Sequence, residues 1–222
     1  YPHARFFCSY LFSSSSSPFP SSPSISRFYG LQWVALNAFV GVLAFFFSAV
    51  FHSRDLPTTE LLDYSFAFLF ACSNLAAIFS LIFPLYPSPS SPPPPSRSYL
   101  RSFSLFSVGV LTVSHLYSLL FVNLDYGWNM VVVVVTSVGV FFCSCFFLFQ
   151  HFGERGAWKV MVASGGGLAL GAVFELWDFP PIWLVLDAHA CWHFSTPWIY
   201  MIFYSYFERD YCSSSVFFPF LK

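Results

Sequence analysis

Apolar residues occur along this chain in long runs that are separated by short polar segments. A membrane-spanning helix needs about 20 predominantly apolar residues. The runs that reach or approach this length are residues 31–51, 61–83, 99–122, 129–149, 157–174 and 182–207. Because an unpaired backbone amide in lipid costs several kcal/mol, such runs form helices rather than isolated strands. The pattern therefore predicts an all-α, polytopic bundle of transmembrane helices with six visible spans.

The composition supports lipid as the main solvent of the chain. Its 222 residues are 57% hydrophobic and 9% charged, whereas a soluble domain carries about 25% charged residues. The formal net charge of -1 leaves no basic surface for nucleic acid. We therefore expect no nucleic-acid partner.

The remaining segments define the expected organisation of the chain. Residues 1–27 are rich in Ser and Pro and are expected to form a disordered leader. Residues 28–210 form the transmembrane domain, in which a Pro/Ser loop at 84–98 interrupts the apolar pattern, and residues 211–222 form a tail. The chain begins at Tyr1 rather than Met, so we expect an N-terminally truncated product.

The charged residues sort to opposite sides of the membrane when the six spans are crossed in order. Of the nine Lys and Arg residues, only Arg54 falls on the side where the first span ends. The others, on the opposite side, are Arg5, Arg27, Arg97, Arg101, Arg155, Lys159, Arg209 and Lys222. Cytoplasmic loops carry an excess of Lys and Arg. This rule predicts that the basic side and the C-terminus are cytoplasmic, and that the side of Arg54 is luminal or extracellular.

Histidine spacing on the predicted luminal side indicates a metal site. His189 and His193 are four residues apart, so two imidazoles share one helix face. A third imidazole from another helix, for which His52 is the natural candidate, gives the three-ligand zinc arrangement with an open water position. Asp63 could orient or deprotonate that water, and Ser48, one turn before His52, could donate a hydrogen bond to the water or to a developing oxyanion.

Simpler explanations exist for each of these residues, because a lone histidine in a membrane often hydrogen-bonds a carbonyl. However, ionisable residues near hydrocarbon cost roughly 2.5–3.5 kcal/mol each, so several on one side favour a shared ion. His115 and Asn129 are expected to form interhelical hydrogen bonds, or else to touch substrate or support the metal ligands. Asp187 is expected to support the ligands, and Asp178 either to do so or to end a helix. The glycines at 165–167 and 171 predict close helix packing.

Several strings resemble one known family. They are FFSAVFHSRD (46–55), TELLDY (59–64), LDYGWNM (124–130), FELWDFPP (174–181) and DAHACWH (187–193). They resemble the post-GPI-attachment-to-proteins family of GPI-anchor lipid remodellers, within the CREST superfamily of membrane hydrolases. The superfamily pattern of a Ser, a His, an Asp and a late HxxxH falls here on Ser48, His52, Asp63, His189 and His193.

The resemblance implies a seven-span fold, of which six spans are visible here, and a Zn²⁺ cofactor. It also implies a phospholipase A2 activity that removes the sn-2 acyl chain from the membrane lipid of GPI-anchored proteins, on the luminal side of the Golgi or endoplasmic reticulum. Two alternatives stay open. One is an amidase like the related ceramidases, and the other is a receptor or folding factor in which zinc is structural.

The charge pattern gives a direct test of orientation. A glycosylation tag inserted in the turn after Arg54 should be modified, because this turn is predicted to face the lumen, while a tag near Ser90 should stay unmodified. Gel mobility before and after deglycosylation shows whether each tag carries a glycan. The opposite pattern would show that the orientation is inverted.

Overall fold

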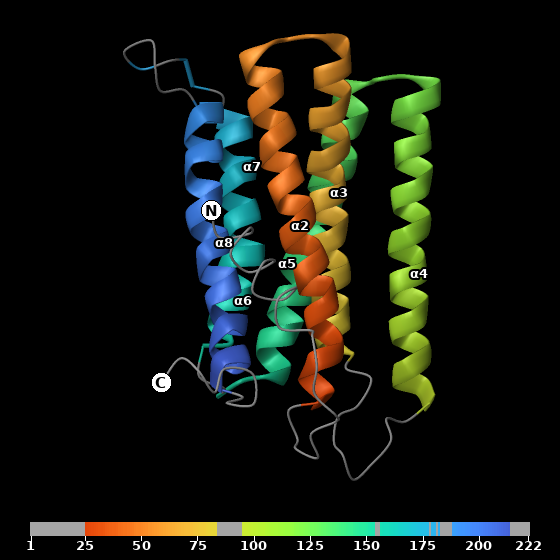
Figure 1. Ribbon diagram of the computed structural model, residues 1–222, viewed down its shortest axis with the longest axis vertical. Coiled ribbons are helices and arrows are strands. Elements are labelled where there is room, and N and C mark those ends of the chain that lie inside the picture. The colour runs from red at the N-terminus through yellow and green to blue at the C-terminus, as the bar shows by residue number, and fades with distance from the viewer. Residues whose placement is uncertain are drawn as a thin grey trace.

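The computed structural model describes residues 25–83, 95–153, 156–177, 179–180, 182 and 188–213, which form a bundle of antiparallel helices (Figure 1). No β-strand occurs in this part of the chain, so the predicted all-α class is confirmed. Some helical residues, His189 and Glu175 among them, are described by backbone only. The elements are α2 (Ile25–Ser53), α3 (Pro57–Ile82), α4 (Pro95–Tyr117), the π-helical η1 (Ser118–Val122), α5 (Tyr126–Gln150), α6 (Trp158–Val160), the π-helical η2 (Met161–Gly166), α7 (Gly167–Trp177) and α8 (Ala188–Ser213).

Among the described residues, four helices are long and apolar enough to cross a membrane. They are Gln32–Ser53, Pro57–Ile82, Ser96–Val122 and Tyr126–Gln150, and they match the first four predicted spans. The fifth predicted span corresponds to the continuous stretch α6–η2–α7, and the sixth corresponds to α8. The polytopic arrangement inferred from the sequence is therefore confirmed.

Several helices extend beyond the apolar runs that predicted them. α4 begins at Pro95, inside the predicted loop 84–98, because a proline at the first helical position lacks only an amide that would be unpaired there anyway. α2 begins at Ile25, inside the predicted leader, and α8 continues to Ser213. The hydrocarbon sets the length of the apolar part only, and polar turns can extend a helix into the interface. Residues 1–24, 84–94 and 214–222 lie outside the described residues.

Short capped turns bring the predicted luminal segments to one end of the bundle. The Asp125 carboxylate accepts a hydrogen bond from the Trp128 amide at 2.9 Å and caps α5. At the start of α3, the Thr59 hydroxyl accepts a hydrogen bond from the Leu56 amide at 3.0 Å. Figure 1 shows the α2–α3 and α4–α5 turns at the same end as the last turn of α7 and the first turn of α8.

α3 lies at the centre of the bundle and α4 at its edge. In the most apolar part of α3, 67% of the residues are buried, whereas the corresponding value for α4 is 17%. Figure 1 shows α4 standing beside α3, on the side away from α8. α4 exposes Phe103 and Phe106, and η1, which follows it, exposes Phe121, as expected of helices that contact lipid.

Buried polar side chains connect α8 to α2 and α3. The Tyr204 hydroxyl donates to Asn37 Oδ1 at 2.8 Å, and Asn37 Nδ2 donates to Ser73 Oγ at 3.0 Å. Asn74 Nδ2 donates to the Tyr200 hydroxyl at 2.8 Å. All these side chains are buried. Since lipid gives no hydrophobic force between helices, such bonds and close packing specify which helices meet.

Glycines allow the fifth helical stretch to approach its neighbours closely, as predicted. A Cβ atom on Gly165 would lie 2.9 Å from Cδ2 of Phe141 in α5. A Cβ atom on Gly171 would lie 2.5 Å from Nε1 of Trp192 in α8, and one on Gly167 would overlap Ile199. α8 therefore packs tightly on α7 and η2.

Removing one bond of the polar connection should lower stability measurably. Tyr204→Phe leaves Asn37 Oδ1 buried without its donor, at an expected cost of about 1 kcal/mol. For a chain of this size that is a decrease in Tm of about 2–4 °C, measured by thermal unfolding in detergent. Tyr99→Phe removes the same hydroxyl from an exposed position of α4 and should leave Tm unchanged. Equal Tm values for both variants would contradict the structural role of Tyr204.

Candidate metal centre

Ser48, His52 and His193 converge from the ends of two helices. Ser48 Oγ lies 3.5 Å from Nε2 of His193, although 145 positions separate them in the sequence. The rings of His52 and His193 have their centres 5.3 Å apart at an interplanar angle of 71°. Ser48 is 6% exposed, His193 is half-buried, and His52 is exposed at the last turn of α2. The structure thus unites three of the five predicted site residues.

The spacing of the two imidazoles can be compared with that of two histidine ligands on one zinc ion. Zinc binds imidazole nitrogen at about 2.0–2.1 Å in tetrahedral geometry, which places two ligand rings with their centres roughly 5 Å apart. The observed 5.3 Å agrees with this spacing. His189 lies one turn before His193 on α8, and its side chain lies outside the described part of the structure. Within the described residues, no group of three or more His, Cys, Asp or Glu side chains is placed to hold a metal.

The register between α2 and α8 is set by two contacts at different depths. Ser48 meets His193, and Asn37 meets Tyr204. On both helices the two contact residues are eleven positions apart, which is three helical turns or about 16 Å, so they share one face. The buried Asn37–Tyr204 bond therefore holds α8 at the height where His193 lies opposite Ser48.

Aromatic packing places Asp63 beside the end of α2. The rings of Phe47 and Phe66 stack with their centres 4.5 Å apart, and those of Phe51 and Tyr64 lie 6.2 Å apart. Because α2 and α3 are antiparallel, this register puts Asp63 level with His52. Asp63 is half-buried in the second turn of α3.

Trp192 supports His193 from the side of α7. The two rings lie nearly parallel, with centres 5.5 Å apart and an interplanar angle of 19°. The indole in turn rests on Gly171, where even a methyl group would overlap it. The glycine-dependent packing of α7 on α8 therefore restricts the orientation of a candidate metal ligand.

His115 and Asn129 bind each other rather than the other site residues. His115 Nε2 donates to Asn129 Oδ1 at 3.0 Å, and both side chains are buried. The His115 ring also packs on Phe68 of α3 with centres 4.4 Å apart. The expected interhelical hydrogen bond is present, and it lies on the α4 side of α3. The predicted supporting residues Asp178 and Asp187 lie outside the described residues.

Four polar residues that position α8 were not predicted from the sequence, namely Asn37, Asn74, Tyr200 and Tyr204. Two features of the sequence could have indicated them. Asn37 and Asn74 lie within apolar spans, where a polar side chain needs a partner. Tyr200 and Tyr204 are spaced by one turn on the helix that carries His193, and they fall on the same face as this histidine.

A family model described as the Per1-like family matches residues 5–211. The chain belongs to the Per1-like family. Curated proteins resemble this chain over most of the length of this chain. The human protein named GPI-specific phospholipase A2-like PGAP3 is 33% identical over 193 residues, which cover 86% of this chain and 54% of that protein. The Drosophila melanogaster post-GPI attachment to proteins factor 3 is 32% identical over 199 residues, covering 85% of this chain and 53% of the fly protein.

A third member, PGAP3 of Xenopus tropicalis, is 35% identical over 179 residues, covering 77% of this chain and 51% of the frog protein. The chain thus spans about half the length of the curated relatives that it matches. No solved structure matches the chain significantly.

The proximity of the imidazoles predicts that they share one metal ion. His52→Ala and His193→Ala should each lower the zinc content of the purified protein, because losing one of three ligands weakens a zinc site strongly. His3→Ala, far from these residues in the sequence, is the matched control and should keep full zinc content. Metal analysis by mass spectrometry measures the zinc content of the three variants. Full occupancy in the His193→Ala protein would exclude the proposed site.

Proposed function

We propose that this protein is a zinc-dependent acyl ester hydrolase that removes the sn-2 acyl chain from the lipid of GPI-anchored proteins. The supporting observation is the convergence of Ser48, His52 and His193 at one end of the bundle. The names of the human and fly relatives, a GPI-specific phospholipase A2-like protein and a post-GPI attachment factor, favour this substrate. GPI-anchored proteins and membrane lipid are then its partners.

The residues have distinct roles in this proposal. His52, His189 and His193 would hold the metal. Zinc bound there would supply a water with a pKa lowered towards about 7 and would polarise the ester carbonyl. Asp63 accepts the proton as the water attacks, and later returns it to the leaving oxygen. Ser48 donates a hydrogen bond to the oxygen on which negative charge develops.

The depth of the site suits a glycerolipid ester. Ser48 lies five residues before the end of α2 at Ser53, or roughly 7 Å below the helix end at 1.5 Å per residue. The ester groups of a glycerolipid lie at the boundary between headgroups and acyl chains, at a similar depth. His52, one turn nearer the helix end, is exposed and can be reached from the headgroup region.

The charges support one orientation of the chain in the membrane, and the family resemblance supports its location. Arg97, Arg101 and Lys159 lie on helices that begin at the end of the bundle opposite Ser48 and His52, which the positive-inside rule assigns to the cytoplasm. In this orientation the site faces the lumen of the Golgi or endoplasmic reticulum, where the glycan and protein of a GPI-anchored substrate also lie.

The catalytic base provides the sharpest test. Asp63→Asn keeps the shape of the side chain but cannot accept a proton, so it should retain zinc and reduce hydrolysis by about 10²- to 10⁴-fold. Asp55→Asn removes an exposed carboxylate from the neighbouring turn and should leave the rate unchanged. Ser48→Ala should reduce the rate by roughly 10²- to 10³-fold through loss of the oxyanion donor.

Each variant is expressed in cells that lack their own remodeller, as this chain and as a chimera with the N-terminal half of a relative. Mass spectrometry of the lipid on a GPI-anchored reporter measures the sn-2 chain. Normal remodelling by the Asp63→Asn protein would exclude Asp63 as the catalytic base. A zinc-loaded wild type that leaves the reporter unchanged but cleaves ceramide would favour the amidase. A zinc-loaded protein that cleaves neither lipid would favour a receptor or folding factor.

A further inference from the structure

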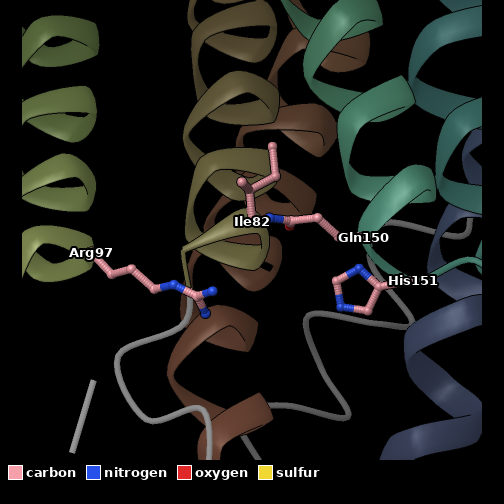
Figure 2. Close-up of a pocket in the computed structure, with 4 residues that line it drawn as sticks. All are labelled: Ile82, Arg97, Gln150 and His151. Carbon is pink, nitrogen blue, oxygen red and sulfur yellow. The ribbon is translucent and has the colours of Figure 1, made fainter. Parts of the chain in front are cut away.

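A recess of about 270 Å³ lies at the opposite end of the bundle from the candidate metal centre, between the ends of α3, α4 and α5 (Figure 2). The described residues that line it are Ile82, Arg97, Gln150 and His151. Figure 2 shows Arg97 extending from α4 towards the end of α3, with Gln150 and His151 on the side of α5. We propose that this recess binds the phosphate group of an acidic membrane lipid.

The polar side chains of the recess match a phosphate group. The planar guanidinium of Arg97 can donate two parallel hydrogen bonds to phosphate oxygens. Gln150 adds an amide donor. The Nδ1 atom of His151 lies 2.9 Å from the Phe147 carbonyl and donates to it, so Nε2 of the neutral ring is an acceptor and can take a hydrogen bond from a protonated phosphate oxygen. Stacking on Phe147, with ring centres 4.2 Å apart, holds this ring in place.

The charge of this part of the structure is favourable for an anion. No acidic side chain is among the described residues that line the recess. Arg101 lies one turn beyond Arg97 on α4 and is buried, so a second positive residue lies on the same helix near this end. Lys159, at the same end, donates to Ser205 at 2.9 Å and is directed towards α8 instead.

The surfaces around the recess favour a lipid over free phosphate as the source of that group. Phe103 and Phe106 on α4 are 69% and 70% exposed, and Phe149, next to Gln150, is 78% exposed. Such faces contact acyl chains, so the recess opens where hydrocarbon meets water. A lipid can place its phosphate in the recess and its chains along these helices. The volume, just below the roughly 300–1,000 Å³ of pockets for whole ligands, suits a headgroup phosphate.

This site does not rest on the proposed hydrolase function, because it involves other residues at the other end of the helices. It gives the protein a preference for acidic lipid in one leaflet, which is the cytoplasmic one if the charge pattern sets the orientation. A positive residue that contacts the phosphate of an acidic lipid strengthens binding of that lipid by about fivefold. Arg97 is therefore the residue whose removal should have the largest effect.

The test uses the purified full chain in nanodiscs of phosphatidylcholine that contain a minor fraction of phosphatidic acid. Native mass spectrometry measures the ratio of the two lipids retained on the protein. We expect wild type to retain phosphatidic acid preferentially, Arg97→Gln to lower the ratio about fivefold, and Arg97→Lys to keep most of it. Lys159→Gln removes a positive charge from the same end, outside the recess, and should leave the ratio within twofold of wild type.

Two results would overturn the proposal. One is an equal ratio in the wild-type and Arg97→Gln proteins, or no preference in the wild type itself. The other is displacement of phosphatidic acid by an equal concentration of inorganic phosphate, which would identify an anion site that does not recognise lipid. Thermal unfolding of each variant checks that the fold is kept, and Arg97 is exposed, so its substitution should not change Tm.

Discussion

The position of α8 against α2 is the constraint on which the candidate metal centre depends. In lipid, apolar surface gives helices no reason to prefer one register over another, so buried polar bonds must specify it. Tyr204 and Asn37 make such a bond, and its location three turns below Ser48 and His193 is the same on both helices. A shift by one residue would rotate His193 away from Ser48 by about 100°. The polar connection in the core thus aligns Ser48 with His193, which the proposed chemistry requires.

The two faces of α8 pack at different distances from their neighbours. Towards α7 and η2, glycines bring the backbones close, and Trp192 rests directly on Gly171. Towards α2, the long side chain of Tyr204 reaches across to Asn37. The hydrogen-bonded side chains of Tyr204 and Asn37 span a wider gap between the two helices than a pair of aliphatic side chains in contact would. The same gap, three turns higher, accommodates the rings of His52 and His193 at 5.3 Å. The close packing of α8 on α7 therefore makes the site rigid, and the wider separation of α8 from α2 leaves space for the two imidazole rings.

The helices could be predicted well from the sequence, for physical reasons. Each span must contain about 20 apolar residues, and residues four apart must share a helix face, so Ser48 and His52 could be paired without a structure. The bond of Asn37 to Tyr204 joins positions 167 residues apart, and only the assembled bundle shows which polar residues meet. For the same reason, the sequence predicted that His115 and Asn129 each form an interhelical hydrogen bond, but it did not predict that they bond to each other. The π-helical turns η1 and η2 have no signal in propensity, because they arise where tertiary packing accommodates an extra residue.

The separation of charge between the two ends bears on the proposed metal site as well as on the predicted orientation. A histidine binds zinc in its neutral form, and a nearby cation repels the metal ion. At an effective dielectric constant of about 20, two unit charges 4 Å apart interact by roughly 4 kcal/mol, so one poorly placed arginine would weaken a zinc site a hundredfold or more. Arg54 is the one Lys or Arg residue predicted on this side, and it lies exposed in the α2–α3 turn, where water screens its charge. Arg97, with Gln150 and His151, lies instead around the recess at the far end. The charge pattern from which the orientation is predicted therefore also keeps most Lys and Arg residues away from the candidate metal ligands, and it places Arg97 at the recess proposed to bind a lipid phosphate.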